Sequence, residues 1–220
     1  AWRKRPLPWV AYFSDPWLNN PYLSYSFFGK LVNGYFESMV IKNADRLIFN
    51  SQRVRETVMA KYPATYSQKT IVIPHFFDAS LHTAKQQVKN TKCTFSYVGN
   101  FYGPRTPLPL FRALAGLKQQ CRLPNAVEFQ LIGGLSYRYR RELKKMGLEE
   151  FVKIVSPVPY LESLRLMVAS DILVLIDAPA LGESIFESAK LFDYLGAKKP
   201  ILGITPPGAA TDFIRNLKIG

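Results

Sequence analysis

Short apolar runs alternate with segments of helical spacing along the chain, and this alternation constrains the fold more than any other feature. In the second half, runs typical of strands lie at residues 94–99, 128–134, 152–155, 172–176 and 201–204. Segments with helical periodicity lie at residues 108–119, 137–146, 161–169, 188–196 and 209–217. Strands that alternate with helices of this length form a parallel sheet covered on both faces. We therefore predict an α/β fold.

The first part of the chain shows the same alternation with shorter elements. Strands are predicted at residues 9–13, 46–50 and 70–74, and helices at residues 27–42 and 52–61. Residues 79–92 are polar and lack periodicity, which is typical of a connection between domains. We therefore predict one domain over residues 1–78, a connection over 79–92 and a second domain over 93–220.

Residues 188–202 are predicted to form a helix, a tight turn and a buried strand. Leu191 and Leu195 lie on one helical face, which indicates packing on a core. Gly196 is predicted to end the helix, and the apolar run 201–204 is typical of a strand buried on both faces.

Charged side chains occur on this helix and near the ends of two predicted strands. Lys190 and Asp193 suit a ligand with phosphate and hydroxyl groups, although a surface ion pair has the same spacing. Gly99 ends a strand where a phosphate can approach the backbone, and Arg105 can add a bidentate contact. Glu183 follows another predicted strand. Because the carboxyl ends of parallel strands share one sheet edge, we expect these residues to converge there.

The chain is basic, with 29 Lys and Arg against 16 Asp and Glu and a formal net charge of +13. Such a charge favours polyanionic partners, which include nucleic acids, anionic lipid surfaces and phosphorylated small molecules. The basic residues are scattered over several elements and no recognised nucleic-acid motif occurs, so we expect no nucleic-acid partner. No apolar run is long enough to span a membrane.

The chain has two histidines and two cysteines, at spacings that do not suit a metal site. His75 is predicted to be structural and His82 to be solvent-exposed. Cys93 and Cys121 are expected to be reduced thiols, which is typical of a cytosolic protein.

Several blocks of sequence, in this order, resemble retaining nucleotide-sugar glycosyltransferases of the family 4 type. In the second half they are VGNFYGPR (98–105), FQLIGG (129–134), ASDILVL (169–175) and KLFDYLGAKKPIL (190–202). In the first half they are SDPW (14–17), ADRLIFNS (44–51) and VIPHFFD (72–78). The resemblance implies a GT-B architecture with two Rossmann-like parallel-sheet domains. The first would be incomplete, and the chain an internal portion of a longer enzyme.

The resemblance also implies a role for individual residues of the donor site. Gly99 and Asn100 would lie at the donor phosphates, with Arg105 and Lys190 neutralising the diphosphate. Asp193 would replace the family's ribose-binding Glu. The remaining donor-binding residues would be Leu191 and, in the loop 157–160 beside the base, Pro159.

Two acids are assigned a catalytic role by the same resemblance. Glu183 is the preferred carboxylate near the donor sugar, but it lies ten residues before Asp193, where the family's spacing is eight. Glu187, six residues before Asp193, stays open as the alternative. Many relatives have a His beside the acid in the first-half loop, so Asp15 is the candidate for contact with sugar or acceptor.

The activity implied is transfer of a hexose from a UDP- or GDP-linked sugar, with retention, to a glycan or lipid-linked acceptor. No Asp-x-Asp motif occurs, so we expect a metal-independent enzyme without a cofactor. The basic helix 137–146 is predicted to be a solvated face, and its functional alternative is contact with anionic lipid headgroups on the inner face of a membrane. An epimerase of the same fold and a basic nucleic-acid-binding protein are the alternatives.

Overall fold

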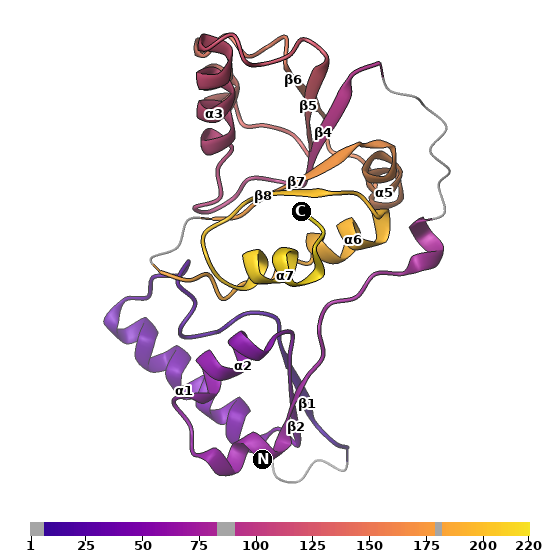
Figure 1. Cartoon of the computed structure of the whole chain (residues 1–220). Coiled ribbons are helices and arrows are strands. Elements are labelled where there is room, and N and C mark those ends of the chain that lie inside the picture. Colours follow the sequence, from indigo (N-terminus) through magenta and orange to yellow (C-terminus); the bar gives the residue numbers. More distant parts are fainter. Residues whose placement is uncertain (1–6, 83–90, 179–181) are drawn as a thin grey trace. The chain divides into compact units, whose positions relative to one another are not determined.

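Two compact α/β units make up the chain, which we describe from a computed structural model (Figure 1). The residues described are 7–82, 91–178 and 182–220. The first unit contains residues 1–75 and 185–187, and the second contains residues 76–184 and 188–220. Both sheets are parallel, so the predicted fold class, α/β of the GT-B type with two Rossmann-like units, is confirmed.

The first unit has a three-stranded parallel sheet with strand order β1-β2-β3. The strands are β1 (Val10–Phe13), β2 (Arg46–Phe49) and β3 (Thr70–Val72), and the helices are α1 (Phe27–Asn43) and α2 (Gln52–Met59). Ser26 and Ser51 cap the two helices, because their hydroxyls accept the backbone N–H of Gly29 and Val54. The core gathers apolar side chains from β1, β2 and both helices, among them Phe13, Ile41, Leu47, Phe49 and Val54.

The second unit has a five-stranded parallel sheet with strand order β6-β5-β4-β7-β8. Its strands are β4 (Cys93–Val98), β5 (Val127–Ile132), β6 (Val152–Val155), β7 (Ile172–Ile176) and β8 (Ile201–Ile204). Its helices are α3 (Leu108–Gln119), α4 (Tyr137–Lys145), α5 (Tyr160–Ala169), α6 (Lys190–Ala197) and α7 (Ala209–Leu217). Two short 3-10 helices, η2 (Ala64–Lys69) and η3 (Ala79–His82), occur earlier in the chain.

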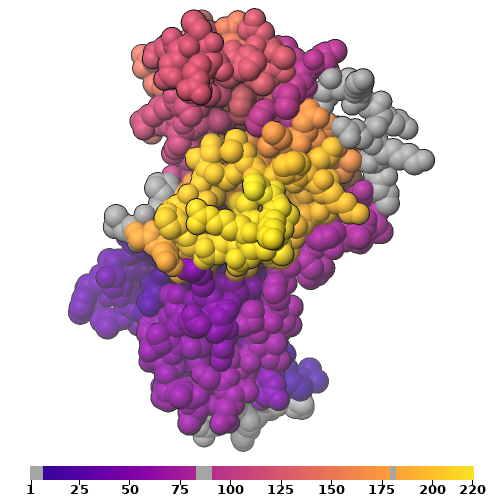
Figure 2. Space-filling view, viewed as in Figure 1, coloured from indigo at the N-terminus to yellow at the C-terminus, as the bar shows by residue number. Residues whose placement is uncertain are grey.

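Helices cover both faces of this sheet. Alternate residues of β7 separate the two layers: Val174 and Ile176 pack with α3 and α4, whereas Leu173 and Leu175 pack with α5, α6 and α7. Figure 2 shows the segment from α6 to α7, coloured yellow, as one continuous packed layer. Strand β7, Ile172–Ile176, therefore carries apolar residues at every position, as a parallel strand covered on both sides requires.

Three details differ from the sequence predictions. Strand β8 is an edge strand of the sheet, so Leu202 is 41% exposed and the run 201–204 is not buried on both faces. Gly196 lies inside α6, which ends instead at Lys198 in the left-handed conformation. His82 is not solvent-exposed but half-buried, because its imidazole packs on Gly196 and, edge-on, against Phe77.

The predicted connection between the domains is described only in part. Residues 79–82 form η3, and residues 83–90 lie outside the described residues. Within the described part of the chain, none of the helices combines the length and the apolar character that crossing a membrane requires.

Candidate functional site

The strand order of the second unit reverses beside β4. From β4 the chain continues to β5 and β6 on one side, and then returns to place β7 and β8 on the other side. In open parallel sheets, ligands bind outside the carboxyl ends of the strands at such a point of reversal. The topology therefore selects the carboxyl ends of β4 and β7 as the place to look for a site.

A tyrosine from α6 holds these two strand ends apart. The pairing of β4 with β7 ends at Ser96 and Leu173. Beyond it, the buried Tyr194 hydroxyl accepts the backbone N–H of Val98 at 3.2 Å and donates to the carbonyl of Val174 at 3.1 Å. Two backbone groups that would otherwise lose their partners are thus satisfied, and α6 is fixed against both strands.

Two glycines bring the backbone close together at the end of β4. Gly99 has φ +127° and Gly133, after β5, has φ +124°, a region that favours glycine. A Cβ atom on Gly133 would lie 2.6 Å from the carbonyl oxygen of Gly99. A pocket of about 270 Å³ opens beside them, lined by Asn100, Phe101 and the segment that follows Gly133.

Lys190, the first residue of α6, points its ammonium group at this turn. Its Nζ donates to the Tyr97 hydroxyl at 2.9 Å and lies 4.3 Å from the centroid of that ring. A Cβ atom on Gly99 would lie 2.5 Å from the same Nζ. Burial, together with the nearby charge of Arg105, lowers the pKa of Lys190 to about 7.

Arg105 reaches the same sheet edge and is paired with a buried carboxylate. Its guanidinium donates to Oδ1 of Asp177 at 3.0 Å, and the two side chains are only 11% and 1% exposed. Burial works against the charged form of Arg105, but the bond to Asp177 and the neighbouring charges outweigh it and raise its pKa. Nε of Arg105 and Oδ2 of Asp177 are buried without a partner among the described residues.

Asp177 and Tyr97 were not predicted as site residues. Asp177 is the first residue after β7, where a carboxylate directly follows an apolar run, so its position was a usable signal. Tyr97 carries no comparable signal, because an aromatic residue within a strand is ordinary core material. It is fully buried and stacks on Phe101, with 4.4 Å between ring centroids.

Lys190 and Asp193 do not pair with each other. Asp193 accepts a hydrogen bond from the Tyr160 hydroxyl at 2.9 Å, which ties α6 to the start of α5. Burial and this bond raise the pKa of Tyr160 to about 12. Pro159 is exposed at the N-terminus of α5, beside Tyr160, as the predicted loop requires.

Leu191 is another of the predicted donor-binding residues. Its side chain is fully buried in the core, and its backbone N–H donates to the carbonyl of Ser188 at 2.9 Å. The side chain is therefore not available to a ligand in this structure, and it anchors α6 instead.

The two candidate acids lie in different units. Glu183 is exposed in the second unit, beside Ser184, whose backbone pairs with the segment around Gly208 just after β8. Glu187 belongs to the first unit, where burial raises its pKa and the charge of Arg53 opposes that rise. Within the second unit, Glu183 thus lies next to a residue that pairs with the chain just after β8.

Asp15 follows β1 in the first unit. It is exposed, and one of its oxygens accepts a hydrogen bond from the Ser14 hydroxyl at 3.3 Å. Asp15 thus lies just beyond the carboxyl end of a parallel strand, where α/β proteins often have functional side chains.

The fold is that of a parallel α/β protein of two units, and comparison with solved structures agrees. A scan against protein-family models and a search of curated proteins each find no match. Among solved structures, the chain is similar to Anabaena HepE in complex with UDP, with a TM-score of 0.64 and 16% identity over 96% of this chain. It is similar to S. aureus TarM, with a TM-score of 0.65 and 14% identity over 93% of this chain.

A third similar structure is sucrose-phosphate synthase from Thermosynechococcus elongatus, with a TM-score of 0.65 and 15% identity over 98% of this chain. The chain spans 62% of HepE, 38% of TarM and 59% of the synthase. HepE is also known in complex with UDP-glucose. At these identities the likeness establishes the fold.

Proposed function

We propose that this chain forms part of a glycosyltransferase that uses a nucleoside diphosphate sugar as donor. One observation carries the proposal: Lys190 meets the glycine turn after β4, and Arg105 is held by Asp177 after β7, so both lie at the carboxyl ends of these neighbouring strands. A diphosphate carries concentrated negative charge and must approach the backbone closely. This edge offers cationic side chains for the charge and glycines for the close approach. The similarity to structures recorded with UDP and UDP-glucose supports the proposal.

The nucleoside would lie between α5 and α6. The carboxylate of Asp193 can accept hydrogen bonds from both ribose hydroxyls, and Tyr160 holds that carboxylate in place. Pro159 would lie beside the base, and Asn100 beside the phosphates. The donor would be UDP- or GDP-linked.

The chemistry would be departure of the nucleoside diphosphate and transfer of a hexose with retention at the anomeric carbon. Negative charge grows on the leaving diphosphate in the transition state, and Lys190 and Arg105 would stabilise it in place of a metal ion. Glu183 would face the donor sugar. A structure of trehalose-6-phosphate synthase, recorded with an analysis of glycosyl transfer with retention, has a related fold and supports retention as the expected outcome.

The first unit would contribute the acceptor side, with Asp15 in contact with the sugar or the acceptor. The acceptor would be a glycan or a lipid-linked glycan. Helix α4 exposes five basic residues that could meet anionic headgroups, namely Arg138, Arg140, Arg141, Lys144 and Lys145.

Thermal melting of the full-length protein with UDP, GDP and their sugars tests the donor site. A ligand at 100 times its Kd stabilises by about 2.7 kcal/mol, which is easily measured. We expect one nucleoside diphosphate to raise the Tm, and Asp193→Ala to reduce that shift while leaving the shift with inorganic pyrophosphate unchanged. A wild-type protein that responds to no nucleoside diphosphate would overturn the proposal. Sugar transfer by the responding protein, analysed for the anomeric configuration of the product, tests the reaction.

A further inference from the structure

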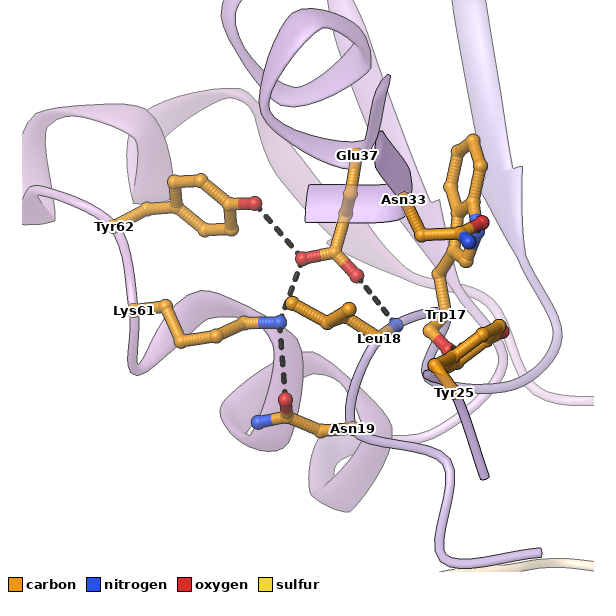
Figure 3. A network of polar contacts seen from close by, with 8 residues as sticks. All are labelled: Trp17, Leu18, Asn19, Tyr25, Asn33, Glu37, Lys61 and Tyr62. Carbon is orange, nitrogen blue, oxygen red and sulfur yellow. Dashed lines mark hydrogen bonds and ion pairs between the residues drawn. The ribbon is translucent and has the colours of Figure 1, made fainter. Parts of the chain in front are cut away.

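A buried carboxylate in the first unit has no place in the donor site. Glu37, on α1, is fully buried and accepts three hydrogen bonds (Figure 3). Its Oε2 accepts the backbone N–H of Leu18 at 2.9 Å. Its Oε1 accepts from Nζ of Lys61 at 2.6 Å and from the hydroxyl of Tyr62 at 2.8 Å.

These bonds tie three separate parts of the first unit to one carboxylate. Leu18 lies in the loop after β1, Glu37 lies in the middle of α1, and Lys61 and Tyr62 follow α2. Nζ of Lys61 extends the network to the Asn19 side chain at 3.4 Å, in the same loop (Figure 3). The loop is therefore bound to the network by its backbone and by a side chain.

Further contacts fix the same loop to the start of α1. The indole N–H of Trp17 donates to Asn33 at 2.9 Å, and the Tyr25 hydroxyl donates to the Trp17 carbonyl at 3.4 Å (Figure 3). Asn33 in turn donates to the carbonyl of Gly29 at 2.8 Å. Each of residues 17, 18 and 19, which directly follow Asp15 and Pro16, is thus held by a hydrogen bond.

Stability alone gives a weak reason for such a charge. Replacing a buried ion pair by well-packed apolar residues is often neutral or stabilising, because desolvation offsets much of the attraction. What a carboxylate offers here is two oxygens that accept a backbone N–H on one side and two side-chain donors on the other. Burial, followed by the bond to Glu37, raises the pKa of Tyr62, so its hydroxyl stays a donor.

We propose that Glu37 is a positioning residue for the acceptor side, which orders the loop after β1 so that Asp15 keeps a fixed orientation. The inference rests on the proposed function, because Asp15 is assigned to the sugar or acceptor there. Glu37 itself touches no substrate. It acts through Leu18 and Lys61 on a loop whose first residues carry the functional carboxylate.

The test compares Glu37→Gln with wild type in the full-length protein. The amide keeps the shape but turns one acceptor into a donor, which opposes either the Leu18 N–H or the Lys61 and Tyr62 donors. We expect kcat/KM for the acceptor to fall about tenfold to hundredfold, because small displacements of a positioning loop have effects of that size. The Kd of the nucleoside diphosphate should stay within about twofold of wild type.

Glu56→Gln is the matched control, because Glu56 is exposed on α2 and its carboxylate accepts a hydrogen bond from the Gln52 side chain, one turn earlier on the same helix. Its acceptor kinetics should equal those of wild type. Tyr62→Phe serves as a second variant if Glu37→Gln does not fold, since it removes one donor and leaves the other two. We expect the same selective loss on the acceptor side, smaller in size.

A direct readout of the loop separates positioning from general destabilisation. Amide hydrogen exchange at Leu18 should speed up at least about tenfold in Glu37→Gln, while exchange in α2 stays slow. Unchanged acceptor kinetics, or losses shared equally by donor Kd and acceptor kinetics, would overturn the inference. If wild type binds no nucleoside diphosphate, the proposed function fails instead, and the Leu18 exchange rate alone decides whether Glu37 orders the loop.

Discussion

The ammonium group of Lys190 lies over the ring of Tyr97, 4.3 Å from its centroid, and donates to its hydroxyl at 2.9 Å. This placement puts a cation at the glycine turn without a carboxylate bonded to it. Burial, followed by the charge of Arg105, lowers the pKa of this ammonium to about 7, and a bound anion would favour its charged form.

The first prediction concerns the pH dependence of nucleotide binding. Free Lys190 loses its proton as the pH passes about 7, and a bound diphosphate favours the charged form, so binding above that pH takes up a proton. Affinity for the diphosphate should therefore fall as the pH rises, by up to about tenfold per pH unit. Calorimetry in buffers of different ionisation enthalpy measures the proton uptake. Lys190→Arg, which stays charged, should remove this pH dependence of the affinity. A wild-type affinity that does not change above pH 7 would contradict the prediction.

The second prediction concerns Lys190→Met in the absence of ligand. The folded-state pKa lies below the ordinary value of 10.5, so the unfolded chain binds more protons between about pH 7 and 10.5, and stability rises with pH in that window. Below pH 7 Lys190 is charged in the folded and in the unfolded state, so burial of its charge destabilises the folded protein to the full extent. Lys190→Met should therefore raise the Tm most at pH 6, less at pH 9, while abolishing the shift caused by a nucleoside diphosphate. A lower Tm at pH 6 would show that the ammonium stabilises the free protein.

The third prediction concerns Asp177→Asn. Removing one partner of a buried ion pair leaves a charge uncompensated, so the free energy of unfolding should fall by about 3 kcal/mol. The shift caused by a nucleoside diphosphate should grow, because Arg105 no longer has a competing carboxylate. Denaturant melts with and without ligand measure both. The surface pair of Glu150 with Lys118 provides the control, since Glu150→Gln should cost less than about 1 kcal/mol.

The fourth prediction concerns the contact between Gly196 and His82. A Cβ atom on Gly196 would lie 2.5 Å from Nε2 of the imidazole, so Gly196→Ala should destabilise the second unit by about 1 to 3 kcal/mol. His82→Ala removes the obstacle, and the double variant should therefore be more stable than Gly196→Ala alone. Denaturant melts of all four proteins complete the cycle. Additive effects of the two changes would mean that the contact is not what constrains position 196.

Spacing and apolar runs were a reliable guide to the bounds of several elements. The helix Leu108–Gln119 and the strands Val152–Val155, Ile172–Ile176 and Ile201–Ile204 occur at the predicted residues. The bounds of these elements follow from the spacing of apolar residues, which can be read directly from the sequence. The topology, and with it the shared sheet edge, follows from the same alternation.

Contacts between distant residues were beyond that reasoning. Arg105 finds its carboxylate 72 positions away, and Asp193 is bonded by a tyrosine 33 positions earlier rather than by the lysine one turn away. Gly196 was interpreted as a helix end because glycine often has that role, yet here it makes room for His82. In each instance tertiary packing, which spacing alone does not encode, decides the role of the residue.

The tyrosine hydroxyl that bridges Val98 and Val174 has a consequence for the kinetics of ligand capture. Because Tyr194 already satisfies these two backbone groups, no backbone hydrogen bond between them must break when a ligand arrives at the ends of β4 and β7. Association should then be limited by diffusion and long-range attraction rather than by a conformational step, and differences in affinity between related nucleotides should appear mainly as differences in residence time.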